Sequence, residues 1–140
     1  MNTFEPAIIA FVCNWCTYTA ADLAGTSRLS YHKNIRLIRV MCTGIVDPQY
    51  VIKAFLEGAD AVLISGCHPG DCHYINGNFK ARRRVKLLKE ILPHFGIDSL
   101  RLRLTWIGAS YGIQFAGIMG YLLAQTRELG PTLPDLKMVI

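Results

Sequence analysis

The sequence predicts an α/β fold: a single domain with a four-stranded, mostly parallel sheet and helices on both of its faces. Along the 140-residue chain, a short apolar run, a turn and an amphipathic stretch follow one another four times. This alternation is typical of parallel sheets. No linker, internal repeat or low-complexity tract divides the chain. Right-handed crossover connections limit the possible topologies, and among these we expect the flavodoxin-like strand order 2-1-3-4.

The first half of the chain supplies three of the strands and two of the helices. The first strand is continuously apolar, as in a strand covered on both faces. Arg36 and Arg39 interrupt the second strand and indicate a place near the sheet edge. Asp47 and Pro48 suit the N-cap and first position of a helix, and Gly58 suits its left-handed end. The expected elements are strands 7–12, 35–41 and 61–65 and helices 17–27 and 47–58.

The second half begins with a long loop at residues 66–78 and then supplies two helices and one strand. The expected elements are a basic helix at 79–95, a strand at 100–107 and a helix at 112–129. The strand alternates apolar with polar residues, which indicates one exposed face, as at a sheet edge. We expect residues 1–130 to form the domain and residues 131–140 to form a tail that docks onto a partner.

The last helix is unusually apolar and carries few charges. Its apolar residues are Ile113, Phe115, Ile118, Met119, Tyr121 and Leu122. Helices of this kind are more often buried against another surface than solvated. We therefore expect this helix to dock onto a partner subunit together with the tail.

Composition excludes a disordered chain, since 51% of the residues are apolar and only 18% are charged. The first residues lack the pattern of a secretory signal, so we expect a cytoplasmic protein. The longest apolar stretch, residues 107–124, is interrupted by four glycines and several polar residues. No membrane span is therefore expected.

The net charge of +5 is concentrated in the basic helix, where six cations fall within residues 80–89. Such a cluster can contact phosphates, but no nucleic-acid-binding motif accompanies it. We therefore expect a solvated helix face or a docking surface for an acidic partner, and no nucleic-acid partner.

Five cysteines follow the expected strands. Cys13 comes after the first strand, Cys42 after the second and Cys67 after the third, while Cys16 and Cys72 lie three and five residues beyond Cys13 and Cys67. Because the carboxyl ends of parallel strands meet at one edge, where open α/β sheets place their ligands, all five thiols can converge there. An odd number of cysteines without a secretory signal argues against a disulfide framework.

Clustered thiolates suit zinc or an iron–sulfur cluster. Two alternatives stay open: a structural zinc module, and a dithiol oxidoreductase that uses the C-x-x-C pair of Cys13 and Cys16. The second leaves the other three cysteines without a role. We expect His68 and His73 to shape the loop or to hydrogen-bond a sulfur rather than to bind metal. The sequence contains no phosphate-binding loop and no nucleophile–histidine–carboxylate set, which indicates an electron carrier rather than a complete enzyme.

Three motifs around the cysteines resemble those of a known family. They are C-N-W-C-x-Y-x-x-A-D-L-A-G at residues 13–25, V-M-C-T-G at 40–44 and G-C-H-P-G-D-C-H-Y-x-x-G-N at 66–78. With similarity from about Ala7 to Gly130, they resemble the delta subunit of methyl-viologen-reducing hydrogenase. The resemblance implies a [2Fe-2S] electron-transfer subunit in a cytoplasmic hetero-oligomeric complex. Such a subunit would relay electrons from a hydrogenase or formate dehydrogenase to the flavin subunit of heterodisulfide reductase, where they would be bifurcated.

The family motifs contain all five cysteines, whereas a [2Fe-2S] cluster takes four ligands. We rank Cys13, Cys16 and Cys42 first and place Cys72 ahead of Cys67 for the fourth position. The loop that carries Cys72 can fold back over the cluster, while Cys67 follows its strand directly.

Overall fold

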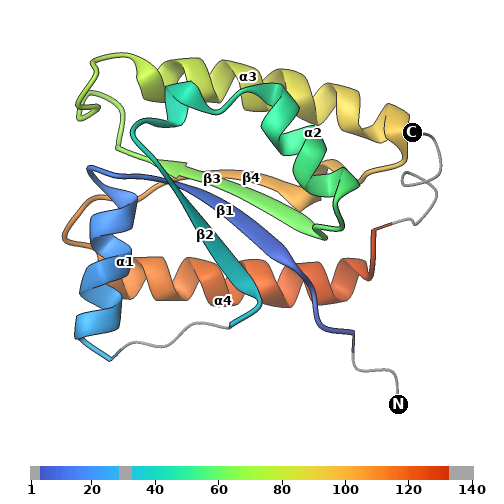
Figure 1. Cartoon of the computed structure of the whole chain (residues 1–140), viewed down its shortest axis with the longest axis horizontal. Helices are drawn as coiled ribbons and strands as arrows, with labels where there is room; N and C mark the ends of the chain where they lie inside the picture. The colour runs from blue at the N-terminus through green and yellow to red at the C-terminus, as the bar shows by residue number, and fades with distance from the viewer. Residues whose placement is uncertain (1–3, 29–32, 133–140) are drawn as a thin grey trace.

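Four parallel strands form one sheet in the order β2-β1-β3-β4, which confirms the predicted fold class and strand order. The computed structural model describes residues 4–28 and 33–132. The strands are β1 (Ile8–Cys13), β2 (Ile35–Val40), β3 (Ala61–Gly66) and β4 (Leu102–Trp106). All four point the same way, so their carboxyl ends lie at one edge of the sheet (Figure 1).

Two helices cover each face of the sheet, as predicted. The α-helices are α1 (Thr17–Thr26), α2 (Pro48–Leu56), α3 (Gly77–Ile91) and α4 (Gly112–Leu129). One face carries α1 and α4, and the opposite face carries α2 and α3 (Figure 1). Short 3-10 helices occur at Thr43–Ile45, Leu92–Phe95 and Ser99–Arg101. Within the described ranges, no helix combines the length and apolarity that crossing a bilayer requires.

Local chemistry sets the ends of the elements. The predicted cap of α2 is confirmed: Asp47 Oδ1 accepts a hydrogen bond from the Gln49 N–H at 2.8 Å. The basic helix begins earlier than expected, at Gly77, and its last turn is 3-10 because Pro93 has no N–H to donate. The strand predicted at 100–107 begins only at Leu102, since the preceding residues form a 3-10 turn.

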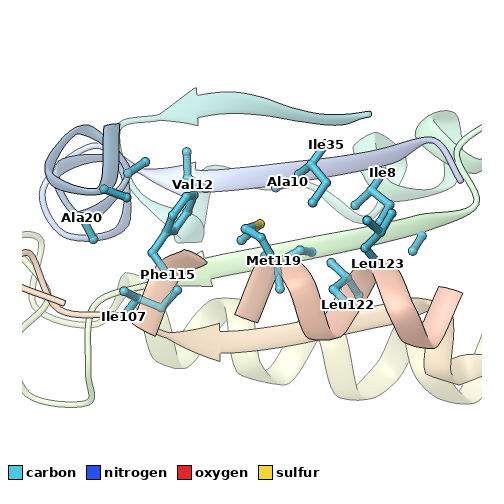
Figure 2. Close-up of a cluster of buried hydrophobic side chains, with 14 residues drawn as sticks. Ile8, Ala10, Val12, Ala20, Ile35, Ile107, Phe115, Met119, Leu122 and Leu123 are labelled. Atoms are coloured by element: carbon cyan, nitrogen blue, oxygen red, sulfur yellow. The ribbon is translucent and has the colours of Figure 1, made fainter. Parts of the chain in front are cut away.

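The sheet and α4 enclose one of two apolar cores. Ile8 and Val12 of β1 face Phe115 and Met119 of α4, and all four side chains are fully buried (Figure 2). Alternate residues of β1 serve the second core, where Phe11 packs between the sheet and the helices α2 and α3. The first strand is thus buried on both faces, as its continuous apolar run predicts.

Half of the six apolar residues singled out on α4 are buried inside this domain, whereas Ile113 and Tyr121 are exposed, so docking of this helix onto a partner stays a prediction. Phe115, Met119 and Leu122 are buried against β1 and β3, and Ile118 packs on the same core. Of the predicted tail, residues 131–132 belong to the described structure, and residues 133–140 lie outside it.

The outer strand β4 is half-buried on both faces rather than exposed on one. Arg103 donates to Gln125 Oε1 of α4 at 2.7 Å, and its guanidinium lies 4.9 Å from the centre of the Tyr121 ring. Leu104 packs toward α3 on the other face. Arg103 therefore contacts α4, and Thr105 Oγ1 donates to Ser65 Oγ of β3 at 3.0 Å, so neither polar side chain only faces solvent.

Candidate metal centre

The carboxyl edge of the sheet carries all five cysteines. Cys13 is the last residue of β1, and Cys16 immediately precedes α1. Cys42 follows β2 and caps the 3-10 helix Thr43–Ile45, where its Sγ accepts the Gly44 N–H at 3.4 Å. Cys67 follows β3, and Cys72 lies in the loop that leads to α3.

The five sulfurs form two groups. In the first, Cys16 and Cys67 are joined as a disulfide with Cα atoms 5.4 Å apart, and the Sγ of Cys13 lies 3.7 Å from that of Cys67. In the second, the Sγ atoms of Cys42 and Cys72 lie 3.8 Å apart. Cys67 therefore adjoins both cysteines of the C-x-x-C pair, although the sequence ranking placed it last.

The distances between these sulfurs fit a tetrahedral metal. Bonds of about 2.3 Å at a tetrahedral angle place two thiolate sulfurs about 3.8 Å apart. Cys42 and Cys72 have this spacing at 3.8 Å, and Cys13 and Cys67 have it at 3.7 Å. The donor set therefore suits a thiolate-bound metal or cluster. In the described part of the chain, no three potential ligands are arranged for a single metal ion.

Gly77 allows α3 to begin directly against the second pair. A Cβ at this position would overlap the Cys42 Sγ and would lie 3.3 Å from the Cys72 Sγ. Gly44 is equally close-packed, because its Cβ would lie 2.9 Å from the Cα of Gly77. In the sequence, Gly77 stood out only as part of the third motif. Its actual role is a close approach between segments 35 positions apart (77 − 42).

Backbone N–H groups at the start of α3 bind the Cys72 sulfur. Burial alone would raise the pKa of Cys72, but hydrogen bonds from the Asn78, Tyr74 and Gly77 amides and from the Cys42 thiol outweigh it, so the pKa is lowered. Burial raises the pKa of Cys42, and the neighbouring Cys72 adds to this effect. Within this pair, Cys72 is therefore the more acidic thiol.

Asn78 holds the loop between Cys67 and α3, a role that sequence reasoning missed. Its buried side chain donates from Nδ2 to the carbonyl oxygens of Cys67 at 3.1 Å and His68 at 3.0 Å. Its Oδ1 accepts the Phe79 N–H at 2.9 Å. The only signal in the sequence was its place as the last residue of the third motif.

Aromatic side chains lie beside the cysteines at this edge. Trp15, between Cys13 and Cys16, stacks on His73 with ring centroids 3.8 Å apart and planes 15° apart. Tyr74 contacts both rings edge-on. Among the described contacts, neither His68 nor His73 hydrogen-bonds a sulfur.

Hydrogen bonds from hydroxyl groups and from an arginine connect the segments that carry the cysteines. Ser65 Oγ, two residues before Cys67, lies 3.1 Å from Thr17 Oγ1 and accepts from Thr105 Oγ1 at 3.0 Å. Arg84 of α3 donates to the carbonyl oxygens of Gly44 and Val46. One of the six cations of the basic helix is therefore structural.

Comparisons with known proteins show the family of the chain. Residues 8–130 match the family model described as methyl-viologen-reducing hydrogenase, delta subunit. The chain is 49% identical over 128 residues to the iron-sulfur D subunit of the F420-non-reducing hydrogenase of Archaeoglobus profundus, covering 91% of this chain and 93% of that relative. It is also 49% identical over 130 residues to the iron-sulfur D subunit of the F420-non-reducing hydrogenase vhc of Methanococcus voltae, covering 93% of this chain and 90% of the relative.

A third relative carries the same segment within a much longer protein. The chain is 46% identical over 132 residues to the A subunit of the ferredoxin:CoB-CoM heterodisulfide reductase of Methanosarcina mazei. The match covers 94% of this chain but 17% of that relative.

Proposed function

The chain belongs to the methyl-viologen-reducing hydrogenase delta subunit family, and from this premise we propose that it is a [2Fe-2S] electron-transfer subunit. It relays electrons from a hydrogenase or formate dehydrogenase to the flavin subunit of heterodisulfide reductase, in a complex that bifurcates them. The relatives named as hydrogenase iron–sulfur subunits and as the A subunit of a heterodisulfide reductase support an electron-transfer role in these systems.

One observation carries the proposal: the two pairs of sulfurs at the sheet edge have the spacing of thiolates on tetrahedral metals. A [2Fe-2S] cluster has two such metals and, when bound, supplies one-electron transfer. The chain's own residues position the thiolates, and the amides around Cys72 favour its ionised form.

We assign Cys42 and Cys72 to one iron and Cys13 to the other. The remaining position lies between Cys16 and Cys67. The 3.7 Å spacing between Cys13 and Cys67 favours Cys67, whereas the sequence ranking favoured Cys16. A chain that binds the cluster through either residue must have the Cys16–Cys67 disulfide reduced. A cytoplasmic location provides the reducing conditions that this requires.

One observation favours the dithiol alternative. The Cys13 thiol lies 3.7 Å from Cys67, which is in a disulfide with Cys16, and this arrangement suits thiol–disulfide exchange. That function uses three cysteines and gives Cys42 and Cys72 no role.

The apolar rim of the cysteine edge supports docking of the redox partners there. Large apolar side chains are exposed on the loops that carry the cysteines, namely Trp15, Met41, Ile45, Tyr74 and Ile75. Helices cover both faces of the sheet, so a partner reaches the sulfurs from this edge (Figure 1). The match within a heterodisulfide reductase protein supports that enzyme as the electron acceptor.

Anaerobic purification tests the proposal. We expect a coloured protein with two irons and two sulfides per chain. A colourless protein with one zinc and no sulfide would contradict it and would favour the structural zinc module. Exchange activity that survives metal removal and requires Cys13, Cys16 and Cys67 would favour the dithiol alternative.

Single Cys→Ser variants test the ligand assignment. We expect loss of the visible spectrum in the variants at Cys13, Cys42, Cys67 and Cys72, and a nearly unchanged spectrum for Cys16→Ser. The opposite result at Cys16 and Cys67 would restore the sequence ranking. Unaltered spectra in all five variants would place the cluster elsewhere.

A further inference from the structure

The outer strand β4 presents unpaired backbone groups. It pairs with β3 on one side only. The Ile107 N–H donates to the Gly66 carbonyl oxygen of β3. Because the backbone amides of a strand alternate in direction, the Arg103 and Thr105 amides also point toward β3. The Leu104 and Trp106 amides point away from it. Within the described residues, no backbone partner meets these two outward amides.

A groove runs along this edge between β4 and α3. Its cavity volume is about 370 Å³, and it is lined by Arg82, Val85, Lys86, Lys89, Leu100, Arg103 and Leu104. Val85 and Leu104 belong to the core beneath and form an apolar floor. Arg82, Lys86 and Lys89 recur at helical spacing, so they form a line along one side of α3.

The groove carries positive charge that no ion pair in the described structure neutralises. Four of its seven lining residues are cations and none is acidic. No carboxylate in the described residues lies within ion-pair distance of these four side chains. Burial lowers the pKa of Lys89, and the charge of Arg103 lowers it further, while Asp98 raises it. The Asp98 carboxylate already accepts the Leu100 N–H at 2.9 Å.

We propose that an extended acidic segment of a partner protein binds in this groove as a fifth strand beside β4. Its backbone hydrogen-bonds the outward N–H and C=O groups of Leu104 and Trp106, as in other cases of strand addition. Because side chains of a strand alternate between faces, every second residue meets the line of Arg82, Lys86 and Lys89. Carboxylates at those positions complement the groove. No cysteine lines it, so the inference is independent of the proposed cluster.

The charge of the groove disfavours two other occupants. A second copy of this chain would bring eight cations together at a β4–β4 contact, which is destabilising. A nucleic acid would satisfy the cations but would leave the strand edge without the alternating donors and acceptors of a polypeptide. An acidic strand satisfies both the charge and the backbone.

Zero-length carbodiimide cross-linking of the native complex tests this inference. This reagent joins a lysine amine to a carboxylate in direct contact. We expect Lys86 and Lys89 to couple to one acidic segment of a partner subunit. We also expect the Leu104 and Trp106 amides to exchange with deuterium about tenfold or more slowly in the complex than in the isolated chain. Equal exchange in both states would overturn the proposal.

Charge-reversal variants provide the matched control. The pair Arg82→Glu/Lys86→Glu reverses two groove cations, while Lys80→Glu/Arg83→Glu reverses two cations of the same helix outside the groove. We expect the first pair to weaken partner binding about tenfold or more and the second about twofold or less. Circular dichroism checks that both pairs fold. Equal losses, or a bound species that nuclease removes, would contradict an acidic polypeptide and indicate general anion or nucleic-acid binding.

Discussion

At the scale of single residues, the candidate metal centre depends on how closely the backbone approaches the cysteine sulfurs. Gly77 and Gly44 are in contact at the start of α3, and Gly77 adjoins both Cys42 and Cys72. The size of the side chain at position 77 is therefore limited by Cys42, which is distant in the sequence. Asn78, the next residue, fixes the carbonyl groups of the opposite loop.

Gly77→Ala is expected to impair cluster binding more than folding. The added Cβ overlaps the Cys42 Sγ, so Cys42 or the start of α3 must shift, which costs about 1–3 kcal/mol for an overpacked site. Iron and sulfide content and visible absorption measure the effect. Gly117→Ala is the control, because its Cβ meets nothing within 4 Å and alanine favours a helix by about 1 kcal/mol. Full iron content in the Gly77 variant would show that the close approach is dispensable.

Asn78→Ala is expected to destabilise the loop of Cys67. The change leaves the Cys67 and His68 carbonyl groups without their donor, and unsatisfied buried groups cost about 1–3 kcal/mol each. We expect a lower free energy of unfolding in urea and faster loss of the cluster in air. Asn76→Ala serves as the control, since the Asn76 side chain is exposed and makes no capping hydrogen bond. Equal stability of the two variants would argue against this role of Asn78.

At the scale of elements, the edge opposite the cysteines is held by Asp60, which directly precedes β3. Its carboxylate accepts the Ala7 N–H at 2.9 Å, the Thr132 N–H at 3.1 Å and the Thr132 hydroxyl at 2.8 Å. These bonds join the start of β1 to the segment after α4. Arg101 donates to the Asp60 carbonyl oxygen at 2.9 Å and to the carbonyl oxygen of Leu129 at 3.2 Å.

Asp60→Ala is expected to lower the free energy of unfolding by about 3 kcal/mol. Hydrogen bonds to a charged group contribute about 1.5–3 kcal/mol, and the change also removes the negative charge that favours the buried Arg101 cation. Urea unfolding measures the difference. Asp22→Ala removes an exposed carboxylate from α1 and is expected to change stability by less than about 0.5 kcal/mol. A similar small effect at Asp60 would mean that other contacts close this edge.

At the scale of the whole molecule, the fold follows from patterns that are local in the sequence. A continuous apolar run identified the central strand β1, two arginines placed β2 at an edge, and Asp47 with Pro48 located the start of α2. These signals act within a few residues, and right-handed crossovers then limit the possible strand orders. The apolar face of α4 was harder to interpret, because apolarity alone does not show which surface covers it.

The details of the site depended on contacts that a sequence pattern does not contain. Placing cysteines after parallel strands brought them to one edge, but the pairing of Cys42 with Cys72 joins residues 30 positions apart. The proximity of Cys13 to Cys67 spans 54 positions. The C-x-x-C spacing suggested that Cys13 and Cys16 act as a pair, because this motif describes only one turn of the chain. Such pairings follow from how the loops fold over one another, which no local period encodes.

On the surface of the whole molecule, Ile75 adopts a positive φ that is unusual for its residue type. Ile75 lies in the loop between Cys72 and α3, with φ at 73° and 83% of its surface exposed. A β-branched residue rarely adopts positive φ, and such strain is concentrated at functional sites. Its exposed apolar side chain extends the rim formed by Trp15 and Tyr74. The position suits direct contact with a redox partner at the cysteine edge.

Ile75→Glu is therefore expected to slow electron transfer without removing the cluster. A charge on the rim disfavours close docking, and electron tunnelling falls off steeply with distance. We therefore expect reduction by the proposed hydrogen- or formate-oxidising partner to slow about tenfold, the factor that corresponds to about 1.4 kcal/mol of binding. Stopped-flow bleaching of the visible absorption measures the rate. Leu87→Glu places the same charge at an exposed apolar site in the middle of α3, which is not part of the rim. Equal rates in the two variants would place the docking surface away from Ile75, whereas a slow Ile75 variant with full iron content would assign the cysteine edge to the partner.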